Sequence, residues 1–170
     1  VSLNGTELCS RAMHARTFEL LEHLGTTRQY LADAFANVRE ANYDVRPSPA
    51  EWSAGEVLSH LAMIEVSVAA ILQKKLRRAI AAEILPVAGE QSRRWRNLAG
   101  RLLDEGMKIE APDFVVPDGT MSAVTAWQSL QESRAKLRQI LLAADGKNTE
   151  TIVARHVLLG VLTFEQWLGF

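Results

Sequence analysis

Three stretches of the chain carry apolar residues at steps of three, four or seven, which is typical of helices that bury one face. The first runs from about Thr17 to Val38, the second from Ser53 to about Ala82, and the third from Ser122 to near Asp145. The pattern predicts three long helices. Their inward positions are Leu21, Leu24, Leu31, Phe35 and Val38; Val57, Leu58, Leu61, Ile64, Val68, Ile71, Leu72 and Leu76; and Ala123, Trp127, Leu130, Leu137, Leu141 and Ala144.

Polar residues mark where these helices begin. Ser53 is followed three residues later by Glu56, and this spacing is the signature of a capping box. Ser122 can cap the third long helix. Thr163 with Gln166 repeats the capping signature, so a fourth helix is expected to start there. Two of the polar residues within the apolar stripes are charged, Arg28 and Arg134.

The connecting segments contain helix breakers. Pro47 and Pro49 interrupt the chain before the second helix, and residues 89–106 are predicted to form an extra short helix. Residues 107–120 contain Pro112, Pro117 and Gly119 and are expected to form an extended crossover between the second and third long helices. Residues 147–162 are interpreted as a loop, and residues 1–16 as an N-terminal arm or a separate short helix.

The predicted fourth helix is short. Only two of its turns precede Phe170, and these cannot cover three helices of about twenty residues, each about 30 Å long. We therefore expect that the printed chain is truncated within this helix.

Composition narrows the class of protein. The 170 residues, 48% hydrophobic and 23% charged, suit one globular domain over residues 1–170. A net charge of −1 gives no general attraction for nucleic acid, and no apolar run is long enough for a membrane span. Cys9 is the single cysteine, so no disulfide can form within one chain, and a cytoplasmic location is expected. Apart from Arg11, nothing beside Cys9 would lower its pKa, so a nucleophilic role is weakly supported.

His60 is the main candidate for chemistry. It lies about 90° around the helix from the centre of the apolar stripe, so it borders the core. It can serve as a metal ligand between helices or as a boundary histidine that is satisfied by a hydrogen bond. The pairs Glu19 and His23, and Glu56 and His60, are interpreted as surface pairs. His156 is either a contributor to a site or an ordinary loop histidine.

Three segments resemble one family: PSPAEWSAGEVLSHLAMIE at 47–65, APDFVVPDGT leading into LQESRAKL within 111–137, and RHVLLGVLTFEQWLGF at 155–170. Together they resemble the DinB/YfiT-like superfamily. This resemblance implies an all-α, up-down-down-up four-helix bundle, often a homodimer, with a divalent metal held by three histidines. His60 matches the first ligand, and the other two would follow Phe170. His156 is at best a second-line site residue.

The resemblance leaves two functions open. One is a metal-dependent enzyme, a thiol S-transferase or a hydrolase, that uses zinc or nickel and a low-molecular-weight thiol. The turn at Trp52–Ser53 and the crossover at 111–120 are then expected to border the site entrance. The other is a non-catalytic bundle that binds a partner or a small ligand, with the metal absent or structural.

Overall fold

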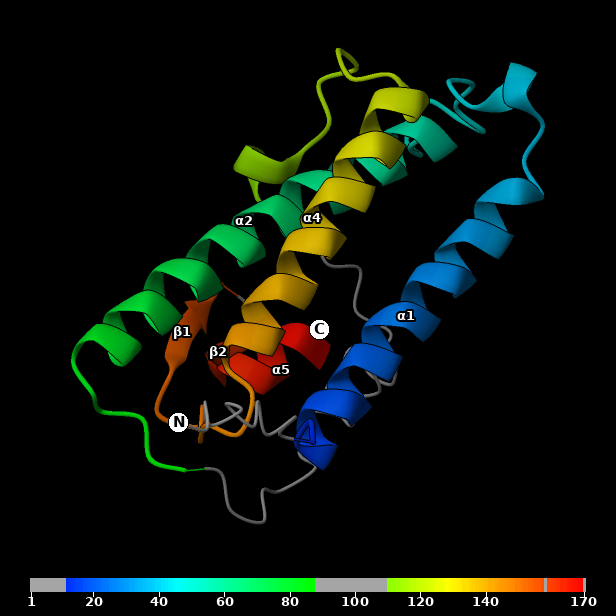
Figure 1. Ribbon diagram of the computed structural model, residues 1–170. Coiled ribbons are helices and arrows are strands. Elements are labelled where there is room, and N and C mark those ends of the chain that lie inside the picture. Colours follow the sequence, from blue (N-terminus) through cyan, green and yellow to red (C-terminus); the bar gives the residue numbers. More distant parts are fainter. Residues whose placement is uncertain (1–11, 88–109, 158, 170) are drawn as a thin grey trace, which may run out of the picture.

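The computed structural model describes residues 12–87, 110–157 and 159–169 (Figure 1). Its long helices are α1 (Ala15–Ala36), α2 (Ala54–Ala81) and α4 (Ala123–Ala143). Two short 3₁₀ turns, η1 (Glu40–Asn42) and η3 (Asp113–Val115), lie in the connecting segments. The chain then forms strands β1 (Val153–His156) and β2 (Gly160–Thr163), and the six-residue helix α5 (Phe164–Gly169).

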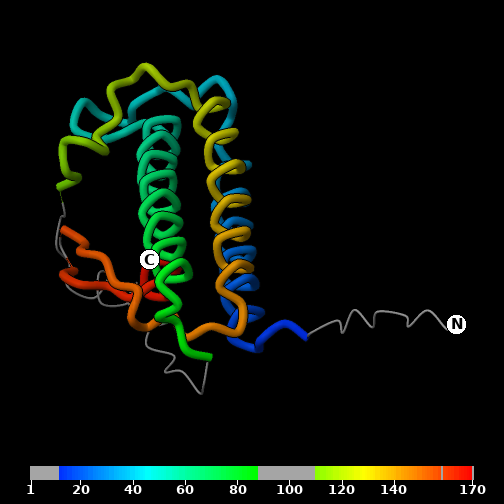
Figure 2. Tube along the Cα trace, turned by 60° about the vertical axis from the view of Figure 1, so that its left-hand side comes forward, coloured from blue at the N-terminus to red at the C-terminus, as the bar shows by residue number. Residues whose placement is uncertain are grey.

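The three long helices lie side by side (Figures 1 and 2). α1 runs in the opposite direction to α2 and α4, which begin at the same end of the molecule. The strands and α5 lie at the other end, where α1 begins. The described part of the chain is therefore mostly helical, with a small sheet packed at one end.

The sequence predicted the helix starts well. The Ser53 and Glu56 side chains form the reciprocal capping box at α2, and the Ser122 hydroxyl accepts from the Thr125 amide at α4. At α5, Gln166 N donates to Thr163 Oγ1 at 3.3 Å and Thr163 N donates to Gln166 Oε1 at 2.9 Å. α1 begins two residues earlier than expected, because His14 Nδ1 accepts from the Arg16 amide.

The prediction of a loop around His156 was wrong, and the described chain is not all-α. Residues 153–156 and 160–163 pair as antiparallel strands, with Ala154 opposite Leu162 and both buried. Ile152, Val153 and Val161 are β-branched, which favours strands. Gly160, at φ 76°, begins β2 in a conformation that side chains disfavour.

Other predictions are settled only in part. The extra short helix at 89–106 and most of the N-terminal arm lie outside the described residues. The crossover is confirmed over 110–120, where η3 is its single helical turn. Val57 and Ile71 were predicted to face inward, but they are 40% and 37% exposed. Their neighbours Leu58 and Leu72, which were also predicted to face inward, are buried in the two core clusters.

By length and composition alone, α2 could cross a membrane, with a mean hydropathy of 1.6 over its most apolar window. The core helix of a soluble protein meets the same criterion. Here one face of α2 packs against α4, and 39% of the most apolar window is buried.

The apolar core has two parts. One lies at the end that carries the strands and α5, and contains Leu20, Leu24, Leu72, Leu137 and Phe164 among others. The second lies at the opposite end, where Leu58, Ala62, Ala123, Ala126 and Leu130 are buried with Phe35 and Trp127 packed against them. Along all three long helices, the stretch between the two clusters carries charge.

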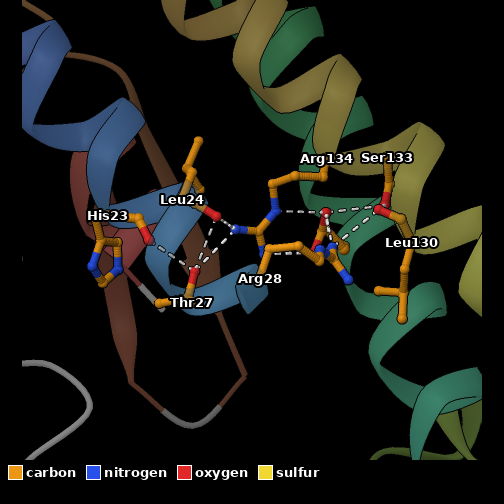
Figure 3. A network of polar contacts seen from close by, with 8 residues as sticks. His23, Leu24, Thr27, Arg28, Leu130, Ser133 and Arg134 are labelled. Atoms are coloured by element: carbon orange, nitrogen blue, oxygen red, sulfur yellow. Dashed lines mark hydrogen bonds and ion pairs between the residues drawn. The ribbon is translucent and has the colours of Figure 1, made fainter. Parts of the chain in front are cut away.

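This charged layer is centred on Glu65 of α2. Figure 3 shows Arg28 and Arg134, the two arginines that meet there. The Glu65 carboxylate accepts from Arg28 Nη2 of α1 at 2.8 and 2.9 Å. It also accepts from Arg134 Nε at 3.1 Å and Nη2 at 2.9 Å, both from α4. Ser133 Oγ donates to it at 3.0 Å. One acid thus holds two arginines, and through them three helices.

The layer carries more positive than negative charge. Arg28 also donates to the Leu130 carbonyl, and its guanidinium lies 5.8 Å from the Trp127 ring centroid. Its Nε and Nη1 have no hydrogen-bond partner among the described residues. Burial lowers the pKa of Arg28, and the Glu65 carboxylate opposes that shift.

We predict that Glu65→Gln lowers the free energy of unfolding by about 3 kcal/mol, because two largely buried guanidinium groups lose their counter-charge. The matched control is Arg46→Gln, which breaks the exposed Arg46–Glu56 pair and should cost much less. Urea unfolding of both variants measures the difference. Equal losses would contradict the importance of the layer.

Candidate functional site

A pocket of about 370 Å³ opens between α2, the crossover, β1 and α5. Trp52, which precedes α2, forms part of its wall. From the crossover come Ala111, Pro112, Phe114 and Val115. The remaining lining residues are His60, Ile64, Ser67, Val68, Ile71, Arg155, His156, Val157 and Trp167. Most of this surface is apolar, so its few polar groups define what it can recognise.

His60 is held in one tautomer. Its Nδ1 lies 2.7 Å from the Val115 carbonyl oxygen, and because a carbonyl only accepts, Nδ1 must carry the proton. The neutral ring then has its lone pair on Nε2. A histidine that donates one ring N–H to a backbone carbonyl and presents the other nitrogen is the usual arrangement of a metal-ligating imidazole.

The surroundings of His60 differ from the expected site between helices. The ring is half-buried and lies 4.9 Å from the Trp52 ring, centroid to centroid. Its hydrogen-bond partner comes from the crossover and not from a neighbouring helix. Glu56, four residues before His60, instead pairs with Arg46, which with the Ser53 amide lowers the pKa of Glu56 to about 2.

His156 lies in the same pocket, so the two histidines singled out from the sequence are brought together. His156 ends β1 and is buried against Trp167, with ring centroids 5.2 Å apart. The Leu159 amide donates to its Nδ1 at 3.2 Å. Burial lowers the pKa of His156, so its ring is neutral at neutral pH.

The histidines fit a metal unequally. His60 has the tautomer of a ligand, whereas Nδ1 of His156 is already used by a backbone amide. Within the ranges that the structure describes, no group of three His, Cys, Asp or Glu residues is arranged to hold an ion. The described residues therefore offer one ligand that fits the three-histidine expectation. Cys9 lies outside those ranges.

Sequence reasoning missed two wall residues, Arg155 and Trp167. Trp167 Nε1 donates to the Ala154 carbonyl at 3.2 Å, and Trp167 also lines the pocket. Arg155 gave no signal, because its place in the wall depends on the β-hairpin. Residues 153–156 alternate in burial in the structure, but their sequence does not alternate between apolar and polar side chains, so it carried no clear signal.

The pKa of His156 generates a pH prediction. Because burial lowers this pKa below the unfolded value, the unfolded chain binds more protons as pH falls through about 6.5. The contribution of His156 to stability is complete above that value and is lost below it. His156→Gln should therefore weaken the loss of stability between about pH 7.5 and pH 5.5. Thermal unfolding across this range measures it, and an unchanged slope would contradict the assignment.

A comparison with protein-family models gives a match to the DinB superfamily over residues 23–170. No significant match is found among curated proteins or among solved structures. The matched region contains most of α1, all of α2 and α4, the β-hairpin, α5 and every residue that lines the pocket. The chain belongs to the DinB superfamily.

Proposed function

We propose that this protein is a metal-dependent enzyme of the DinB superfamily, a thiol S-transferase or a hydrolase, whose site is the pocket at His60. The observation that carries the proposal is the hydrogen bond from His60 Nδ1 to the Val115 carbonyl. It leaves the Nε2 lone pair available, and no described residue donates a hydrogen bond to that atom. Two further histidines beyond Phe170 would complete the ligand set.

The same proposal includes the finer features of the family. The fold would be an up-down-down-up four-helix bundle, in which the first three helices correspond to α1, α2 and α4. The protein would be a cytoplasmic homodimer, and zinc or nickel would be the ion. A low-molecular-weight thiol would be the co-substrate of the transferase.

In this proposal, the metal ion and the residues of the pocket wall have separate roles. A divalent ion would supply Lewis acidity, which stabilises a thiolate or activates water at neutral pH. The residues of this chain would do the rest. Val115 orients the His60 ring through its carbonyl, and Trp52 packs beside that ring. The apolar residues exclude water from the bound molecule, which strengthens polar interactions inside.

A second function is favoured by a different observation. The wall is mostly apolar, and the described residues contain no set of three metal ligands. The alternative is a non-catalytic bundle that binds a small ligand in this pocket without a metal. Both functions use the pocket, and only the first requires His60 Nε2.

Metal content separates the two. We predict that protein made from the full coding sequence and supplied with zinc or nickel retains about one ion per chain, and that His60→Ala loses most of it. His23→Ala is the matched control, because His23 is also a half-buried helical histidine but lies outside the pocket wall. Elemental analysis and circular dichroism of all three proteins give the readout.

Equal, near-zero metal in wild type and His60→Ala would reject the enzyme proposal and leave the ligand-binding alternative. Equal metal loss in both histidine variants, with the fold intact, would show that His60 has no special role.

A further inference from the structure

One pocket residue has no part in the proposed metal site. Arg155 lies in the wall and is exposed, and it forms no ion pair or hydrogen bond with any residue that the structure describes. Three described arginines near the core, by contrast, are paired with carboxylates. Arg16, Arg28 and Arg134 each bind a carboxylate, of Glu165 or Glu65. Among the described residues, the charge of Arg155 therefore has no carboxylate partner.

The described residues around Arg155 in the pocket wall carry no negative charge. Among the described residues of the pocket wall there is no Asp or Glu, and Arg155 is the only Lys or Arg. Asp113 of the crossover, which lies between two wall residues, is exposed and is not part of the wall. His60 and His156 can offer ring nitrogens, but neither brings a negative charge. An anion entering the pocket meets attraction from Arg155 and no opposing carboxylate in the wall.

The other residues of the pocket wall favour a ligand with a large apolar part. Ile64, Val68, Ile71 and Val157 supply aliphatic surface, and Trp52 and Trp167 supply aromatic faces. A volume of about 370 Å³ is within the range of small-molecule sites. Coulomb attraction is also stronger beside a low-dielectric wall than in open water.

We propose that the pocket binds a small organic anion, a carboxylate on an aromatic or aliphatic body, with Arg155 pairing with the carboxylate. This inference rests on the proposed use of the pocket as the binding site, but it does not require the metal. Arg155 suits this role because a guanidinium can donate two parallel hydrogen bonds to a carboxylate.

The test compares three probes that share one apolar body: 3-phenylpropionate, 3-phenylpropan-1-ol and 3-phenylpropylamine. Isothermal titration calorimetry at neutral pH should show that the carboxylate binds the full-length protein about tenfold more tightly than the alcohol, with the amine weakest. Arg155→Gln should bind the carboxylate and the alcohol alike. Arg155→Lys should retain part of the preference, and added salt should reduce it.

Two controls sharpen the result. Arg77→Gln removes another exposed arginine, which has no partner among the described residues and lies on α2 outside this pocket, and it should leave the preference unchanged. His60→Ala should also keep the preference, since Arg155 is intact. If His60→Ala abolishes the preference, the anion binds through the metal, which supports the proposed function and overturns this inference.

Three other results overturn the inference. The wild type could bind the alcohol or the amine as tightly as the carboxylate, or Arg155→Gln could keep the preference with its fold intact by circular dichroism. Failure of all three probes to bind at millimolar concentration would reject the pocket as a site for such ligands, whatever the metal analysis shows.

Discussion

The charged layer at Glu65 is the constraint on which the arrangement of the three long helices depends. Apolar contacts alone permit helices to slide by a turn, because one leucine can replace another. Glu65 accepts from arginines on two other helices, and a shift of one helix by a turn, about 5.4 Å, would separate these partners. Such a layer adds less net stability than apolar packing would, but it penalises every register that leaves a buried charge unpaired. The main effect of the layer is to align the three long helices with one another.

The same register positions the pocket. His60 precedes Glu65 on α2 by about a turn and a half. When Glu65 meets Arg28 and Arg134, His60 is fixed on the side of α2 that faces the crossover. There the Val115 carbonyl takes the Nδ1 proton, and Trp52 packs beside the ring. The β-hairpin then brings Arg155 and His156 to the other side of the pocket. The charged layer and the pocket are therefore two consequences of one alignment.

Much of the helical structure could be predicted, because periodicity and caps are local. The box at Ser53 and Glu56 marks the start of α2, and the stripes mark the buried faces. The hairpin was missed because four-residue strands leave little pattern, and the apolar run around His156 suited a loop as well. His60 was found as a candidate, but its partner Val115 was not, since a contact across the fold has no signature in spacing. The same holds for Glu65, which no sequence pattern joined to Arg28 or Arg134.

The hydrogen bond from His60 Nδ1 to the Val115 carbonyl fixes the tautomer of the neutral ring, with the proton on Nδ1 and the lone pair on Nε2. Two-bond proton–nitrogen correlation spectra of the ¹⁵N-labelled full-length protein read the tautomer of each histidine ring directly. We expect that the His60 ring carries its proton on Nδ1 at neutral pH. When zinc is added, the proton should stay on Nδ1, and only the chemical shift of Nε2 should change. A ring protonated on Nε2 would contradict this expectation, because such a ring can neither donate to Val115 nor present a lone pair to the pocket.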